Sequence, residues 1–101
     1  MADLTEKEFS QHVGTNFALQ IEQVGALTLA EVKAYMPKEN EQSGMERFSL
    51  YFDGPGHAML PQAIYRMSHE AMGEFDVFLV PIRGDEKGFR YEAVFNYHKP
   101  E

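Results

Sequence analysis

Apolar and polar residues alternate along several short segments of the chain, which is the pattern of β-strands with one buried face. The two clearest segments are residues 16–22 and residues 46–52. The residues predicted to face inward from them are Phe17, Leu19, Ile21, Phe48, Leu50 and Phe52. Ser49 and Tyr51 then point outward, and Tyr51 is expected to be exposed.

Residues 26–36 predict a longer strand in which the alternation changes phase. The apolar residues on its two faces are Leu27 and Leu29 before the change, and Val32, Ala34 and Met36 after it. A change of this kind is typical of a β-bulge, and the pattern places it near Ala30 and Glu31.

The second half of the chain predicts three further strands. The first, within residues 60–69, carries Tyr65 and Met67 on one face and Ile64 and Arg66 on the other. Residues 75–82 are apolar on both faces, so this strand needs cover on both sides. We therefore expect both Phe78, in this strand, and Phe95, in the last one, to belong to the core.

The segment "FDVFLVPIRGDEKGFRYEAVFNY", residues 75–97, predicts a hairpin with a five-residue polar turn at residues 84–88. The residues on one side of its second strand are Phe89, Tyr91, Ala93 and Phe95. Pro81 cannot donate to a ladder of hydrogen bonds, and so it indicates a bulge or the end of pairing on one edge. A second tight turn is predicted at residues 53–58, "DGPGHA".

A short amphipathic helix is predicted before the first strand, within residues 1–13. The residues that define it are Thr5 as its N-cap, Glu8 in a capping box, Phe9 and Val13 on its apolar face, and Gly14 at its end. Because a helix this short is unstable alone, it must pack on the sheet. It is the best candidate to cover the second face of residues 75–82.

These elements predict a mainly β protein: one short N-terminal helix followed by about six antiparallel strands, which form a small meander barrel or a rolled sheet. Residues 1–101 are expected to be one small β-barrel-like domain, because domains cluster near this length. The polar segment at residues 37–44 predicts a surface loop.

The composition of the chain makes several classes of function less favoured. Sixteen acidic residues against nine basic ones give a net charge of −7, which disfavours binding to nucleic acid and to anionic membranes. No segment reaches the ~20 apolar residues that cross a bilayer, and no signal peptide is evident. The chain has no cysteine, which removes thiolate chemistry and fits a reducing compartment. We expect a cytoplasmic protein.

No catalytic, cofactor-binding or metal-binding residues are predicted. The four histidines lack the spacing that places two imidazoles on one face, and no serine lies in a nucleophile motif. A metal site that joins His57 and His69 with a carboxylate stays open as a minor alternative. Paired carboxylates fall in polar segments, where nothing raises their pKa. The expectation is that the protein is not an enzyme.

The arginines and tyrosines leave two further alternatives open. The four arginines, Arg47, Arg66, Arg83 and Arg90, lie in strands that could be neighbours, so two of them could form a bidentate anion site. Cross-strand pairs with acids such as Asp76 or Glu92 are the commoner outcome. Outward tyrosines such as Tyr51 are typical of protein interfaces, although cross-strand packing also explains them.

The succession "FSLYFDGP", "LPQAIYRMSHEAMGEFDVFLVPI" and "YEAVFN" resembles an uncharacterised bacterial family of proteins of about this length, a domain of unknown function. The resemblance extends from about Phe9 to Asn96, and the second half is its specific part. It implies a class but no activity. An association of such proteins with genes for phage-tail-collar-like proteins implies an accessory or assembly role.

Three hypotheses about function follow. The first is a non-enzymatic protein-interaction or assembly module, with an unknown protein partner and with self-association left open. The second is a small-molecule-binding β-barrel, which is less favoured because a barrel of few strands is usually filled by its own side chains. The third is an enzyme whose polar groups are brought together only by folding.

Overall fold

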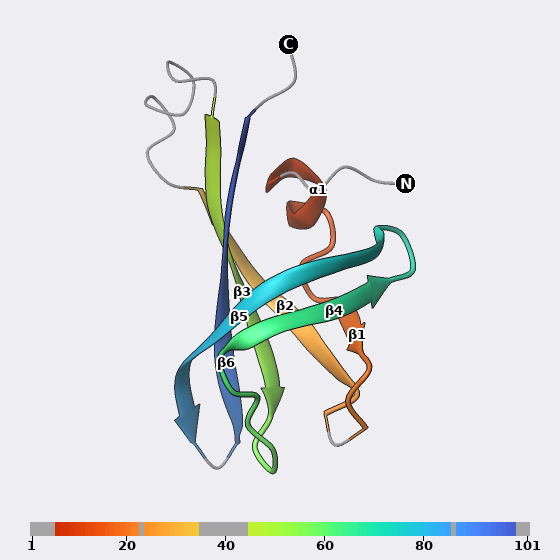
Figure 1. The fold of residues 1–101 in the computed structure, drawn as a ribbon, viewed down its shortest axis with the longest axis vertical. Coiled ribbons are helices and arrows are strands. Elements are labelled where there is room, and N and C mark those ends of the chain that lie inside the picture. The colour runs from red at the N-terminus through yellow and green to blue at the C-terminus, as the bar shows by residue number, and fades with distance from the viewer. Residues whose placement is uncertain (1–5, 23, 35–44, 86, 99–101) are drawn as a thin grey trace.

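The computed structural model describes residues 6–22, 24–34, 45–85 and 87–98, and its six antiparallel strands close into a barrel (Figure 1). The elements are α1 (Glu6–Ser10), β1 (Asn16–Leu19), β2 (Ala26–Ala34), β3 (Met45–Pro55), β4 (Ala63–His69), β5 (Gly73–Asp85) and β6 (Gly88–His98). The predicted fold class is confirmed. The N-cap Thr5, Met36 and the loop at residues 37–44 lie outside the described residues.

The strand order departs from that of a simple meander. Around the barrel the order is β1-β2-β3-β6-β5-β4, and β4 closes the barrel against β1. After β3 the chain crosses to β4, and β6 returns to pair with β3. These two strands have 11 residues each and pair over their whole length. Figure 1 shows β4 and β5 crossing in front of β3 and β6 as a result.

The interior of the barrel is filled by the side chains that the alternation placed inward. Phe17, Phe48, Leu50 and Phe52 are fully buried, and Leu19 is 8% exposed. Ile21 is partly buried and packs against the same cluster. The other buried apolar residues are Phe9, Leu27, Leu29, Leu60, Met67, Met72, Phe75, Val77, Leu79, Tyr91 and Ala93. The inward faces predicted for residues 16–22 and 46–52 are therefore confirmed.

Helix α1 covers a different surface from the one predicted. Its Phe9 is fully buried against the inner rings of the barrel, where β5 and β6 have separated, rather than on the outer face of β5. The outer face of β5 stays open to solvent, and Phe78 is 48% exposed there. Because the aromatic side chains that contact Phe9 lie inside the barrel, α1 packs over the interior and not over the outer face of β5. The predicted core position of Phe78 is wrong, whereas Phe95 packs against the core.

The helix itself is also shorter than the pattern indicates. It ends at Ser10, and residues 11–14 form turns, so that Val13 is 46% exposed rather than on the apolar face of the helix. Gly14 has a φ of 91°, a left-handed conformation that glycine adopts without strain, and its N–H donates to the carbonyl of Leu29. This hydrogen bond ties the end of the helical segment to β2.

Two predicted turns are shorter than expected because glycines belong to the strands. β3 continues to Pro55 and β5 to Asp85, and β6 begins at Gly88. A Cβ atom on Gly88 would lie 2.6 Å from the carbonyl oxygen of Gly54, so these two strands approach too closely for a side chain. The glycines were turn signals in the sequence, but they serve close packing at this end of the barrel.

The bulge predicted near Ala30 and Glu31 is present, and of the two outcomes expected at Pro81 the structure shows the bulge. The register of β2 against β3 shifts between Leu29 and Glu31, and that of β5 against β6 shifts between Pro81 and Arg83. Each bulge adds one residue to one strand and reverses the side to which later side chains point. The second bulge determines the face of β5 from which Arg83 projects.

Candidate functional site

A row of three charged side chains crosses neighbouring strands on the outer face of the barrel. Asp53 of β3 is the register partner of Arg90 of β6, and Arg90 is the register partner of Arg83 of β5. Residues that are opposite in a ladder project from the same face of the sheet. The sequence suggested that arginines could meet in this way, but only the register shows which ones do.

The bulge in β5 brings Arg83 to this face. Without the extra residue, Arg83 would lie opposite Phe89, whose side chain points inward. The register shift instead places Arg83 opposite Arg90 and Gly84 opposite Phe89. A Cβ on Gly84 would lie 2.2 Å from the Phe89 ring, so that ring occupies the space above this glycine. Bulges commonly redirect a side chain in this way.

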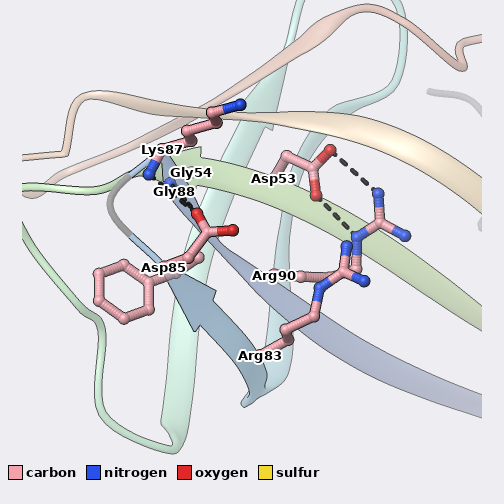
Figure 2. Close-up of a pocket in the computed structure, with 8 residues that line it drawn as sticks. Asp53, Gly54, Arg83, Asp85, Lys87, Gly88 and Arg90 are labelled. Carbon is pink, nitrogen blue, oxygen red and sulfur yellow. Dashed lines mark hydrogen bonds and ion pairs between the residues drawn. The ribbon is translucent and has the colours of Figure 1, made fainter.

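Arg90 is fixed by a bidentate ion pair. Its Nε donates to Asp53 Oδ1 at 2.8 Å, and its Nη2 donates to Asp53 Oδ2 at 3.1 Å. The hydrogen bond that Arg90 donates to Asp53 raises the pKa of the Arg90 guanidinium. No ion pair of Arg83 is found among the described residues, and Figure 2 shows its guanidinium beside that of Arg90.

These residues line a surface pocket of about 230 Å³ near the β5–β6 turn, which we call the arginine pocket (Figure 2). Its lining consists of Asp53, Gly54, Arg83, Asp85, Lys87, Gly88, Phe89 and Arg90. Asp85 Oδ1 accepts hydrogen bonds from the backbone N–H groups of Lys87 at 2.8 Å and of Gly88 at 3.1 Å. These bonds set the shape of the turn that borders the pocket.

The other arginines do not join this site. Arg66 and Asp76 are register partners on β4 and β5, and Arg66 Nε donates to Asp76 Oδ1 at 2.8 Å. This hydrogen bond lowers the pKa of the Asp76 carboxyl group, although both side chains are exposed. The prediction of a cross-strand pair with Asp76 is confirmed. Arg47 is exposed on β3, six residues before Asp53.

Tyr51 is half-buried instead of exposed, so the expectation of an exposed tyrosine at this position is wrong. Its hydroxyl donates to Glu92 Oε2 at 3.1 Å, and the Ser49 hydroxyl donates to the same oxygen at 3.0 Å. Ser49 is fully buried although its side chain points away from the barrel interior. Since a buried hydroxyl needs a partner, the Glu92 carboxylate stabilises this arrangement between β3 and β6.

His69 has a structural role near the end of β4. Its Nδ1 accepts hydrogen bonds from the N–H groups of Ala71 at 3.0 Å and Met72 at 3.3 Å. The ring proton therefore resides on Nε2, which donates to Thr15 Oγ1 at 2.9 Å. The Thr15 hydroxyl in turn donates to the carbonyl of His12 at 2.6 Å. This chain of hydrogen bonds joins β4 to the segment that follows α1.

The surroundings of His69 lower the pKa of its ring. Its ring lies 4.3 Å from the Phe17 ring and 4.7 Å from the His12 ring, measured between centroids. Burial lowers the pKa of His69, and the nearby His12 lowers it further. Among the residues that the structure describes, no three histidines, aspartates or glutamates gather in a way that could hold a metal ion.

This lowered pKa predicts acid sensitivity. Because the folded protein binds the His69 proton less readily than the unfolded chain, the free energy of unfolding should fall as the pH drops below about 6.5. In His69→Asn the Oδ1 atom can still accept from Ala71 and Met72, but it does not titrate. Urea denaturation at about pH 7.5 and pH 5.5 should show a smaller fall for the variant. Equal falls in both proteins would contradict the prediction.

The outer face of β4 and β5 carries apolar side chains in contact with solvent. Ile64 and Phe78 are register partners, and they are 70% and 48% exposed. Val80 follows two residues after Phe78 and is half-buried, and Ile82 in the bulge is 47% exposed. We call Ile64, Phe78, Val80 and Ile82 the outer apolar face. Large apolar side chains that adjoin one another on a surface indicate a binding site, whereas scattered ones are common on any protein.

In the described part of the chain, no helix has both the length and the apolar character required to span a membrane.

Comparisons with known proteins give a family but no activity. Neither the curated proteins nor the solved structures contain a match to this chain. One family model, described as a domain of unknown function (DUF6916), matches residues 4–95. The match includes α1, all of β1 to β5, and most of β6. The chain therefore belongs to the DUF6916 family, a domain of unknown function.

Proposed function

We propose that this protein is a non-enzymatic protein-interaction module that binds its partner through the outer apolar face. The observation that carries the proposal is the exposed cross-strand pair of Ile64, at 70%, and Phe78, at 48%. An apolar pair directly opposite on a sheet presents a continuous contact surface, and its burial by a partner is favourable by about 25 cal/mol per Å².

The partner that fits best is a different protein with a basic surface around an apolar centre. The net charge of −7 attracts a basic protein over distances of about a Debye length and repels a second copy of the same chain. Self-association is therefore the less favoured outcome. The resemblance to proteins associated with phage-tail-collar-like genes leads us to include an accessory role in the assembly of such proteins.

A ligand site inside the barrel is the weaker alternative. Sixteen apolar residues of the described part of the chain are buried, and the largest side chains among them are fully buried aromatic and aliphatic groups. A small barrel filled in this way has its interior volume occupied by protein. A cytoplasmic location is part of the proposal, and the cysteine-free composition is compatible with a reducing compartment.

The proposal is tested by affinity capture from the native host, followed by titration of the purified partner. The double variant Ile64→Ser, Phe78→Ser should bind at least about tenfold more weakly than the parent, because central apolar contacts dominate interface energies. Val94→Ser is the matched control: Val94 is 55% exposed on β6, outside the outer apolar face.

The results separate the alternatives. Loss of binding in the double variant with retention in Val94→Ser supports the proposal. Equal affinities for all three proteins would reject the outer apolar face as the contact surface. Sedimentation equilibrium of the parent is run alongside, and a dimer that the double variant abolishes would assign the face to self-association.

A further inference from the structure

We propose that the arginine pocket is a binding site for a single carboxylate group, held mainly by the guanidinium of Arg83. The inference rests on the pocket alone and does not depend on the outer apolar face.

Among the described residues, Arg83 forms no ion pair. Like charges directly opposite on neighbouring strands destabilise a sheet, yet Arg83 lies opposite Arg90. In the part of the chain that the structure describes, Asp53 pairs with Arg90, through Nε and Nη2, and not with Arg83. In the described part of the chain Arg83 has no carboxylate of its own, so its five N–H donors are available to a ligand. An anion between the two guanidinium groups would relieve their repulsion.

The charges of the pocket favour a carboxylate over a phosphate. Arg83, Lys87 and Arg90 supply three positive charges, and Asp53 and Asp85 supply two negative charges, which leaves one positive charge. A carboxylate neutralises this excess. A phosphate dianion would leave a net negative charge beside two aspartates. The planar fork of an arginine also matches the two oxygens of a carboxylate in a bidentate pair.

The frame around Arg83 is held before any ligand binds. The bulge after Pro81 sets the face from which Arg83 projects, and the Asp53 pair fixes Arg90 beside it. On the other side, Asp85 accepts from two backbone N–H groups of the turn. Donors that are already in place lose less conformational entropy on binding. The volume of about 230 Å³ admits a carboxylate together with a short aliphatic or peptide segment.

Titration of the ¹⁵N-labelled protein with sodium acetate, with NaCl exchanged to hold the ionic strength constant, tests the site. We expect saturable chemical-shift changes in the backbone amides of residues 83–85 and 87–90 and in the Arg83 Nε–H signal. Arg83→Gln should weaken acetate binding at least about tenfold, because hydrogen bonds to charged groups are among the stronger ones. The spectrum of the variant shows directly that it is folded.

Arg47→Gln is the matched control, since it removes the same charge from β3 about 20 Å along the strand from Asp53. It should bind acetate as the parent does. Equal weakening in Arg47→Gln and Arg83→Gln would overturn the proposal, because only net charge would then matter. Shifts that stay linear in the parent, or saturation by inorganic phosphate at a lower concentration than acetate, would overturn it as well.

A free metabolite and a protein terminus can present the same group, and two further probes distinguish them. Propionate represents a small carboxylate, and triglycine with a free C-terminus represents a peptide, with its C-terminal amide as the control. Tighter binding of the peptide than of propionate, abolished by amidation, assigns the site to a protein terminus. The reverse order assigns it to a small carboxylate. Failure of both probes to displace acetate rejects the carboxylate site.

Discussion

Replacing Phe9 with alanine is expected to lower the free energy of unfolding by about 3–5 kcal/mol, as a large cavity in a packed core does. Phe9 is fully buried. The four rings around it, with centroid distances, are Phe95 at 5.5 Å, Phe75 at 5.6 Å, Phe48 at 5.9 Å and Phe17 at 6.2 Å. One side chain from a five-residue helix thus joins β1, β3, β5 and β6. Urea denaturation measures the change.

Phe78→Ala is the matched control for Phe9→Ala, because it removes the same atoms from a ring that is 48% exposed. A half-exposed ring leaves no closed cavity, so the expected loss is below about 1.5 kcal/mol. Because both substitutions remove the same atoms, the difference between the two losses of unfolding free energy measures the effect of burial. If the two variants lost similar stability, or if Phe78→Ala lost more, Phe9 would not be buried among the inner rings as described.

Tyr91→Phe is expected to lower the free energy of unfolding by about 1–3 kcal/mol although it removes a single oxygen atom. Tyr91 is fully buried, and its hydroxyl accepts a hydrogen bond from the backbone N–H of Leu60 at 2.8 Å. Leu60 is itself only 3% exposed, so its N–H would lose its partner away from water. Denaturation in urea at pH 7 gives the difference from the parent.

Tyr65→Phe makes the same chemical change nearby and should cost less than about 1 kcal/mol. Its hydroxyl donates to the carbonyl of Pro61, an exposed pair that water can replace. A large loss for Tyr65→Phe together with a small one for Tyr91→Phe would show that the segment between β3 and β4 is anchored through Tyr65 instead. The Tyr91 bond matters for topology because this segment carries the chain across the barrel.

The two proposed surfaces adjoin each other because both include residues of β5. β5 presents Phe78, Val80 and Ile82 on the outer apolar face, and Arg83 in the arginine pocket comes directly after Ile82. A partner that packs on the apolar residues would thus end near a cationic pocket. The two proposals are tested by different experiments. A result that rejects binding at one surface therefore does not reject binding at the other.

Much of the fold was predictable because the alternation of side chains is a local property. The inward sets of β1 and β3, the bulge in β2, and the hairpin of β5 and β6 follow from the period of two along each strand. The bulge in β5 was indicated by Pro81, which has no N–H to donate. Glycines misled the prediction of turns, because glycine is selected both by turn geometry and by close approach of strands. Gly54, Gly84 and Gly88 serve the second purpose here.

The candidate site was less predictable, because it depends on the register between strands that are distant in sequence. Asp53 lies in a segment that the pattern assigned to a turn, so its pairing with Arg90 had no local signal. The outer face of β5 was misassigned for a related reason. Its apolar side chains predicted cover from α1, but the position of a helix depends on where its own largest side chain finds partners.

The sequence by itself determined the mainly β class, the inward face of most strands, the positions of the bulges and the absence of thiol chemistry, because these depend on residue type and spacing along one chain. Only the tertiary structure decided the strand order, the inward placement of Phe9, the exposure of Phe78, and the meeting of Asp53, Arg90 and Arg83. Those features are set by the closure of the barrel, which joins residues that no local pattern relates.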